Sequence, residues 1–590
     1  MKNANKSKKI FLLYAIIGFG FFIFLLAMLV TVLKSRHLPS QYSFESSKAQ
    51  RGSIISADGF HLATTIKLYK AVVNTRYIDP QKKELFIELF SIYSGIDSKK
   101  IRKKLSKKKK GVVVLSYHIP QIQAQYLKKL ARELRRFKVF MALKNKTTGL
   151  KSVHGLSIIE SGESRIYPYG DLLTPIIGYP HKIEEDGYTR IKGVKGIEKK
   201  FDNELYPKQD GSKRGERDVN SYIILNKNSF TKSEIDGLDI KLTITIALQI
   251  KVEKMLDEMK KELRAKQIMI AVMDIKTSKI LTIASSNRYL PKSIKRSDYS
   301  SLRSGMIEYS FEPGSVIKPI TFALLLDKGL VNPYDLVNGH NGRFKIGRKV
   351  ITDEHRFDWL SAENVIVYSS NIGIAQLAQK LSGHEFNQGL KNFGFSTKST
   401  PDLIYEKIGS IPSPRKLENE IYKATCSYGY GMRANLMQLI RAYSVFNNSG
   451  KMLTPKIVES FIDEFKREIL VESAEEEVVI RSSTAHRMKK ILIKTVQKGT
   501  GKKTRISGLE IGGKTGTAHI VEKGKYVNKY NTAFMGFAND KESKYTIGVV
   551  VVQPKKSQFA SQTAVPVFKK VVEIMVEDGY LTPSQPDIVK

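Results

Sequence analysis

Ser315 and Lys318 lie just past the middle of this 590-residue chain and could together perform nucleophilic catalysis. Three residues apart on a helix, a hydroxyl and an amine share one face. An unprotonated Lys318 could take the proton from Ser315 as the hydroxyl attacks a carbonyl, which is the chemistry of acyl transfer. The same Ser-x-x-Lys spacing also starts at Ser106 and at Ser229, where it indicates no chemistry. The pair by itself therefore leaves two interpretations open, a catalytic serine and an ordinary helix start.

The residues that follow predict how Ser315 is positioned. Residues 320–326 are almost all apolar and Gly329 comes shortly after them, a pattern typical of a buried helix with a glycine stop. Pro319 disrupts a helix least in its first turn, which places Ser315 close to the helix N-terminus. The backbone dipole there favours negative charge that develops during a reaction.

A second polar group, Ser369, Ser370 and Asn371, separates helix-like segments at 362–367 and 372–381. On a loop between helices, Ser369 could relay a proton and Asn371 could donate an amide hydrogen bond to a substrate. A serine that caps the second helix is the simpler explanation of this tripeptide in isolation.

The third group, residues 508–515, matches Gly-x4-Gly-Lys-Thr, the phosphate-binding loop of nucleotide hydrolases. That loop needs a strand before it and a helix after it, so that helix N–H groups hold phosphate. Gly516 and the run 517–521 favour a strand after it instead. We therefore reject a nucleotide hydrolase.

As an edge strand, the same residues could bind a peptide as one more strand of the sheet. Lys514 would supply positive charge, and the hydroxyls of Thr515 and Thr517 would bind a carboxylate. Gly513 and Gly516 would let the backbone of the substrate approach closely.

Residues 10–33 carry no charge and would span about 36 Å as a helix, enough to cross a membrane. A cleaved signal peptide is the alternative, but the basic segment 34–37 stands where a small-x-small cleavage site would be expected. Residues 1–9 contain four lysines, which predicts a cytoplasmic tail. We therefore expect a single-pass anchor in the cytoplasmic membrane, no second span, and a catalytic domain on the periplasmic side.

The formal net charge is +41, from 98 Lys and Arg against 57 Asp and Glu. The sequence has no zinc-finger spacing and no arginine-rich arm, and the charge is spread along the chain, so solvated lysine faces are expected in place of a nucleic-acid site. An anionic membrane surface or wall polymer would also be attracted by this charge. Cys426 is the only cysteine and the ten histidines lack His-Glu-x-x-His spacing, so we predict no disulfide, no metal and no cofactor.

Composition and periodicity predict the remaining organisation. We expect a linker at 34–50, an α+β pedestal at 51–235, a catalytic domain at 236–580 and a tail at 581–590. In the pedestal, residues 51–63 have the pattern of a hairpin that turns at Asp58-Gly59, and the lysine-rich stretch 206–234 looks like a connection between units.

In the catalytic domain, strands are expected at 239–245, 268–274, 280–284 and 546–552, and helices at 247–264 and 565–576. The apolar side of the first helix is expected to consist of Ile250, Val252, Met255, Leu256 and Met259. These elements predict an antiparallel sheet covered by helices, an α+β fold.

The three chemical groups occur in the order Ser-x-x-Lys, Ser-x-Asn and Lys-Thr-Gly, and with them the chain resembles a class B penicillin-binding protein over nearly its full length. The motifs that carry the resemblance lie at 51–63, 165–170, 193–198, 242–243, 312–318, 429–431 and 513–518. The chain departs from the family at Thr245, where aspartate is usual, and at Asn435-Leu436, where Thr-Pro is common. No glycosyltransferase domain fits before residue 237, which argues against class A. Residues 369–373 and 351–355 are similar to the septal, cell-division type.

The resemblance implies a peptidoglycan D,D-transpeptidase with a penicillin-binding fold that cross-links wall stem peptides ending in D-Ala-D-Ala. It implies these roles: Ser315 as nucleophile, Lys318 as general base, Ser369 and Lys514 as proton shuttle, and Asn371, Thr515, Gly516 and Thr517 in substrate binding. The backbone N–H groups of Ser315 and Thr517 would hold the oxyanion. For Lys318 to be unprotonated, burial and the nearby Lys514 should depress its pKa.

The partners implied are β-lactams, a septal glycosyltransferase of the membrane and other division proteins, with residues 51–235 coupling the two enzymes. Two alternatives stay open: a scaffold protein that kept the fold without activity, and a membrane-bound β-lactam sensor or β-lactamase. The second is disfavoured because no Glu-x-x-x-Asn segment of the class A hydrolase kind is evident between Asn371 and Lys514.

Overall fold

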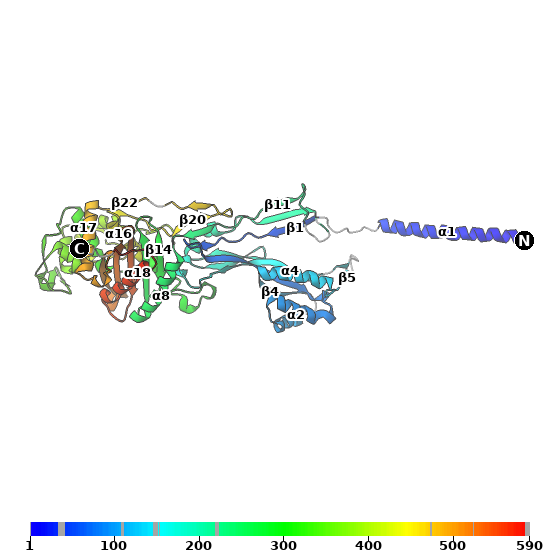
Figure 1. Cartoon of the computed structure of the whole chain (residues 1–590), viewed down its shortest axis with the longest axis horizontal. Helices are drawn as coiled ribbons and strands as arrows, with labels where there is room; N and C mark the ends of the chain where they lie inside the picture. The colour runs from blue at the N-terminus through cyan, green and yellow to red at the C-terminus, as the bar shows by residue number, and fades with distance from the viewer. Residues whose placement is uncertain are drawn as a thin grey trace. The chain divides into compact units, whose positions relative to one another are not determined.

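The computed structural model describes residues 2–584 except 34–41, 108–110, 145–150, 153, 217, 219–222, 473–474 and 523. Part of the predicted linker and most of the predicted tail lie outside these residues. The chain divides into two compact units, Met1–Lys48 with Gln209–Glu234, and Ala49–Lys208 with Ile235–Lys590. Figure 1 colours the chain along its length.

The first unit contains an apolar helix and a small sheet (Figure 1). Helix α1 (Lys2–Leu33) includes the segment Lys6–Leu33, which has a mean hydropathy of 2.8 and is long and apolar enough to cross a membrane. The sheet is antiparallel, with strands β1 (Tyr42–Ser47), β10 (Gly211–Glu216) and β11 (Phe230–Lys232). The predictions that 34–50 is a linker and 206–234 a mere connection are therefore wrong where these strands form. The strands are polar and pair over a long sequence distance, which composition does not reveal.

A nine-stranded sheet forms the pedestal in the second unit. Along the sheet the order is β21 (Glu468–Leu470), β20 (Val458–Ile462), β12 (Asp239–Leu242), β2 (Ile54–Ile55), β3 (His61–Asn74), β7 (Leu156–Ile166), β9 (Tyr188–Gly193) and β8 (Pro180–Glu185), while β4 (Val112–Pro120) pairs with β3. Helices α2 (Lys83–Ser94), α3 (Ser98–Lys107) and α4 (Gln121–Arg136) share a core with β3 and β4.

The strand predicted at 239–245 ends at Leu242 and does not enter the catalytic sheet. As β12 it pairs parallel with β2 and antiparallel with β20, so it belongs to the pedestal sheet. Alternating apolar residues predicted the strand correctly, but they carry no information on its neighbours. The pedestal sheet thus includes strands from both sides of the predicted boundary at residue 236.

A buried ion-pair network ties the pedestal motifs together. Glu198 accepts hydrogen bonds from Arg51 Nη2 at 2.8 Å and from Arg165 Nε at 2.7 Å, and its side chain is fully buried. Removing one partner of such a network leaves an uncompensated buried charge, which typically costs about 3–5 kcal/mol. The predicted hairpin at 51–63 is confirmed, and its Asp58 carboxylate also accepts from the N–H of Ile246, the first residue of helix α8 (Ile246–Leu263), at 3.1 Å.

The catalytic region contains a five-stranded antiparallel sheet. Its order is β14 (Ile280–Ser285), β13 (Gln267–Asp274), β25 (Lys544–Val552), β24 (Lys525–Asn539) and β23 (Glu510–Glu522). Alternate residues of β13 enter two different cores. One core holds α8 (Ile246–Leu263) and α18 (Ala564–Glu577), and the other holds α10 (Lys318–Asp327) and α16 (Leu436–Asn447).

The predicted antiparallel sheet between helices is therefore confirmed, as are the helices at 247–264 and 565–576. Ile250 is the exception on the apolar side of α8, because 42% of it is exposed. Its place in the apolar run was compatible with burial, but the sheet lies against the neighbouring face of the helix.

Candidate active site

Ser315 lies in a tight turn that leads directly into a buried helix. Gly314–Ile317 form a 3-10 turn, η5, and α10 continues the chain with Pro319 in its first turn. Residues 318–326 are buried, so the prediction of a buried helix is confirmed. Ser315 itself is half-buried, whereas Lys318 is completely buried. The nucleophile candidate is thus reachable and its neighbouring amine is not in contact with bulk water.

The Ser369 hydroxyl lies between two buried lysines. It is 3.1 Å from Lys318 Nζ and 2.8 Å from Lys514 Nζ, and neither lysine has exposed surface. Ser369 sits in the loop between α11 (Ala362–Val367) and α12 (Asn371–Ala378), and its φ of 62° is a left-handed conformation. A non-glycine residue held there costs about 1–3 kcal/mol, which the surrounding contacts must offset. Three segments distant in sequence therefore converge on one hydroxyl.

Burial changes the protonation of both lysines. It lowers the pKa of Lys318 to about 7, although Asp353 and Glu354 act in the opposite direction. It lowers the pKa of Lys514 well below its usual range, and the neighbouring Lys318 lowers it further. Of the two expected causes of the low Lys318 pKa, burial is confirmed, whereas Lys514 is not among the groups that lower it. Near neutral pH a large fraction of Lys318 is unprotonated and can accept a proton.

Asp353 holds the loop that presents Ser369. Its carboxylate accepts hydrogen bonds from the Asn371 N–H at 2.5 Å, from the Ile372 N–H at 3.1 Å and from the Ser370 hydroxyl. Ser370 Oγ in turn accepts from the Gly373 N–H at 2.8 Å, so Ser370 is the N-cap of α12 and the capping interpretation is correct for that residue. The Asn371 side chain donates to the Thr352 carbonyl oxygen at 2.9 Å.

Residues 510–522 form strand β23 at the edge of the five-stranded sheet, as predicted. Lys514 pairs with Met535 and Thr517 with Thr532 of β24. No helix follows Thr515, so the arrangement that a phosphate-binding loop requires is absent from this described segment. Thr515 Oγ1 lies 2.8 Å from Thr500 Oγ1 and 3.4 Å from Lys514 Nζ, and Thr517 is half-buried.

The glycines of β23 allow close packing of other segments of the chain against this strand. A Cβ on Gly516 would lie 2.8 Å from Val316 Cγ1 and 2.9 Å from the Pro313 carbonyl oxygen, both in the segment around Ser315. A Cβ on Gly513 would lie 2.6 Å from the ring of Phe534. Both glycines therefore have a packing role within the protein, and their predicted contact with a substrate backbone stays a prediction. Gly516 allows the strand to lie directly against the η5 turn.

Gly314 completes this contact from the other side. Its φ is +62°, and a Cβ there would lie 2.8 Å from the Thr517 carbonyl oxygen. The backbone of Thr517 therefore lies beside the residue that precedes Ser315. The structure thus brings together η5 with the start of α10, the 369–371 loop and β23, the segments that carry all eight predicted site residues.

Sequence reasoning assigned no role to three residues that contact these segments. Asp353 and Thr500 support the loop and the strand, as described above. Glu312 Oε1 accepts from the Gly431 N–H at 2.8 Å, and burial raises the pKa of this carboxyl. Their positions were the one sequence feature that could have indicated these roles. Glu312 lies within the Ser315 motif, Asp353 within the segment 351–355, and Thr500 in the turn-rich segment before β23. Among the residues described, no group of three or more His, Cys, Asp or Glu could hold a metal ion.

Comparison with known proteins matches both regions of the chain. Residues 268–573 match the family model described as penicillin binding protein transpeptidase domain, and residues 46–242 match the penicillin-binding protein dimerisation domain. The probable peptidoglycan D,D-transpeptidase PenA of Neisseria gonorrhoeae is 27% identical over 433 residues, 73% of this chain and 71% of that protein. The peptidoglycan D,D-transpeptidase FtsI of Buchnera aphidicola (subsp. Baizongia pistaciae) is 26% identical over 561 residues, 93% of this chain and 89% of that protein.

Solved structures share the fold. Penicillin binding protein 3 from Mycobacterium tuberculosis, crystallised with aztreonam, has a TM-score of 0.65 and 19% identity, and the match covers 92% of this chain and 99% of that chain.

Proposed function

The chain belongs to the class B penicillin-binding proteins, and we propose that Ser315 is the residue that becomes acylated in this serine-type peptidoglycan D,D-transpeptidase. The observation that supports the proposal is the buried group of Lys318, Ser369 and Lys514, which includes the lysine one helical turn after Ser315. A half-buried hydroxyl one turn before an amine with a pKa of about 7 is suited to act as a nucleophile with that amine as its base.

In the first step Ser315 Oγ attacks the carbonyl between the two terminal D-alanines and Lys318 Nζ takes its proton. Ser369 and Lys514 pass a proton to the leaving amine, the peptide bond breaks, and D-alanine departs. The Ser315 and Thr517 N–H groups hold the oxyanion, a contribution of about 3–4 kcal/mol per well-placed donor. Asn371, Thr515, Gly516 and Thr517 bind the donor peptide, with the two threonine hydroxyls on its carboxylate. In the second step an amine of a neighbouring stem peptide attacks the acyl-enzyme carbonyl, its proton returns to Ser315 Oγ through Lys318, the ester bond to Ser315 breaks, and the cross-link is released.

The direct test is cross-linking by the full-length protein in the presence of a peptidoglycan glycosyltransferase and lipid-linked precursor. We expect release of D-alanine together with cross-linked muropeptide dimers in mass spectra. Release of D-alanine without dimers would instead indicate a carboxypeptidase. Rapid hydrolysis of bound penicillin would favour a β-lactamase or a sensor related to one.

Acylation by benzylpenicillin is expected to depend on pH through Lys318. Below about pH 7 the amine is protonated and cannot accept the Ser315 proton, so the second-order rate of acylation should fall about tenfold per pH unit. Above about pH 7 the rate should level off. Stopped-flow measurements between about pH 5.5 and 8.5 check this, and a rate that stays constant across that range would contradict the role of Lys318 as base.

Gly516→Ala is expected to slow acylation about 10- to 100-fold, because its Cβ would push β23 away from the η5 turn. Overpacking of this kind should also cost about 1–3 kcal/mol of stability. Gly524→Ala is the control for added volume: it lies near the far end of the β23–β24 hairpin, where a Cβ meets nothing within 4 Å, and its φ of +78° confines the strain of alanine to that turn. We expect it to acylate at the wild-type rate, and equal slowing in both variants would refute the packing argument.

A septal role follows from the similarity of residues 369–373 and 351–355 to the cell-division type and from the match to FtsI over most of the chain. In this role a septal glycosyltransferase and other division proteins are the partners, and the pedestal connects the two enzymes. A fluorescent fusion that replaces the native protein should concentrate at the division site. Uniform side-wall fluorescence would contradict the septal assignment.

Lys6–Leu33 would anchor the protein with its N-terminus in the cytoplasm, because residues 2–9 contain four lysines. The single cysteine, Cys426, is buried and can be replaced by alanine to provide a cysteine-free background. A cysteine at Ser301 should then react with a membrane-impermeant maleimide on intact spheroplasts, whereas one at Ser7 should react only after lysis. The reverse pattern would reverse the orientation.

A further inference from the structure

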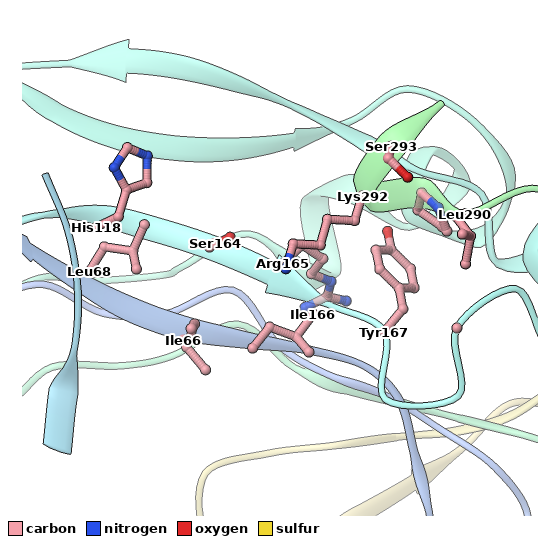
Figure 2. A pocket seen from close by; sticks show the side chains of 12 residues that line it. Ile66, Leu68, His118, Ser164, Arg165, Ile166, Tyr167, Leu290, Lys292 and Ser293 are labelled. Carbon is pink, nitrogen blue, oxygen red and sulfur yellow. The ribbon is translucent and has the colours of Figure 1, made fainter. Parts of the chain in front are cut away.

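A cavity of about 490 Å³ lies between the pedestal sheet and the segment Leu290–Ser293 that follows β14 (Figure 2). The pedestal contributes side chains of β3, β4 and β7 to its wall. None of the eight proposed site residues lines it, so it is separate from the proposed catalytic site. Its volume lies within the range of about 300–1,000 Å³ that is typical of small-ligand sites.

Two buried polar atoms of the wall have no partner in the described part of the chain: Arg165 Nη2 and the Tyr167 hydroxyl. The Arg165 side chain is only 3% exposed. Its other nitrogens are used, since Nε donates to Glu198 at 2.7 Å and Nη1 to the Gly52 carbonyl oxygen at 2.6 Å. The guanidinium is therefore held rigidly with one edge unsatisfied, which is costly for a buried donor.

The remaining polar groups of the wall are also donors or carry positive charge. In Figure 2 the Lys292 side chain extends toward Arg165, and the Tyr167 hydroxyl points toward the Leu290–Ser293 segment. Ser164 and Ser293 add hydroxyls, and none of the 12 lining residues is Asp or Glu. Glu198 pairs with the far edge of the Arg165 guanidinium, but the wall itself carries Arg, Lys and Tyr donors and no carboxylate, an arrangement that suits an anion.

Apolar side chains complete the wall. Ile66 and Leu68 of β3 and Ile166 of β7 lie on the pedestal side, and Leu290 lies across from them. We propose that this cavity binds a small organic anion, a carboxylate or phosphate joined to an apolar group. Its anionic end would accept hydrogen bonds from Arg165 Nη2 and the Tyr167 hydroxyl, with Lys292 as counter-ion. Such a ligand would contact β3, β7 and the 290–293 segment at once and would stabilise their junction.

The test uses full-length protein in detergent micelles and fluorine NMR of para-fluorophenyl phosphate, with the neutral para-fluorobenzyl alcohol as matched ligand. Line broadening of the phosphate that excess octanoate reverses is expected, with at least tenfold weaker binding of the alcohol. Tyr167→Phe and Lys292→Gln should each weaken phosphate binding about tenfold, equivalent to about 1.4 kcal/mol. Lys254→Gln, at an exposed position of α8 outside the cavity, should bind as wild type.

Ser164→Trp is the blocking variant, because the indole would occupy the cavity. It should lose phosphate binding while penicillin still acylates it at the wild-type rate, which shows that it is folded and that the cavity is not the proposed catalytic site. Displacement by octanoate would indicate a soluble ligand, and displacement only by phosphatidylglycerol vesicles would indicate a lipid headgroup. No broadening with the wild type, equal binding of the neutral alcohol, or undiminished binding in Ser164→Trp would each overturn the proposal and leave a water-filled cavity.

Discussion

Ser315→Ala is expected to abolish covalent labelling by fluorescent penicillin and to reduce cross-linking by at least about 10⁴-fold, because the acyl-enzyme cannot form without the nucleophile. Ser315 is half-buried in the η5 turn before α10, so the loss of one hydroxyl should leave the packing of the helix intact. Gel fluorescence measures the labelling, and mass spectrometry of the intact protein measures the acyl adduct.

Ser229→Ala provides the matched control. Ser229 also begins a Ser-x-x-Lys pattern, but its hydroxyl donates to the Asn226 carbonyl oxygen on an exposed turn. This variant should label as wild type. Persistent labelling of Ser315→Ala would show that another serine is acylated and would remove the basis of the proposed mechanism.

Lys318→Met is expected to reduce the rate of penicillin acylation by about 10³- to 10⁴-fold, with little change in folding. The substitution removes the general base, and general-base catalysis contributes about 10²–10⁴-fold to the rate. It also removes the hydrogen bond from Lys318 Nζ that positions the Ser369 hydroxyl. Methionine fills the space of the lysine stem without an amine. Stopped-flow acylation kinetics measures the effect.

The stability of Lys318→Met separates catalysis from unfolding. Burial lowers the folded-state pKa of Lys318 to about 7, so between about pH 7 and the ordinary lysine pKa the unfolded chain binds more protons than the folded chain. The buried lysine therefore destabilises the protein at neutral pH. Replacing it should therefore leave the thermal midpoint unchanged or higher at about pH 7. A lower midpoint with lost acylation would mean that the variant is misfolded. Lys328→Met, at the exposed end of the same helix, should change neither quantity.

The sequence motifs of the pedestal contribute to its folded structure and not to catalysis. Arg51, Arg165 and Glu198 come from three separate motifs and meet in one buried network. Their charges could be recognised in the sequence, but a charged residue in a turn-rich segment is usually exposed, so the network was not expected. The same network immobilises the guanidinium that faces the proposed anion cavity.

Local properties of the chain were sufficient for much of the prediction. The uncharged run 10–33, the apolar run after Ser315 and the continuous apolar strand at 546–552 each specify their own secondary structure. Gly516 after Thr515 excluded a helix and thus a phosphate-binding loop. The order of the three motifs then indicated the family, because motif order is a property of sequence.

Contacts between distant segments were decided only by the tertiary structure. The pKa of Lys318 depends on complete burial, which arises when α10, the 369–371 loop and β23 pack together. Gly516 is required by a turn two hundred residues earlier in the chain, and strand β12 joined the pedestal sheet through partners that its own pattern does not specify. Neighbouring residues determine whether a segment is a helix or a strand, whereas solvation and close packing depend on which surfaces the folded chain brings together.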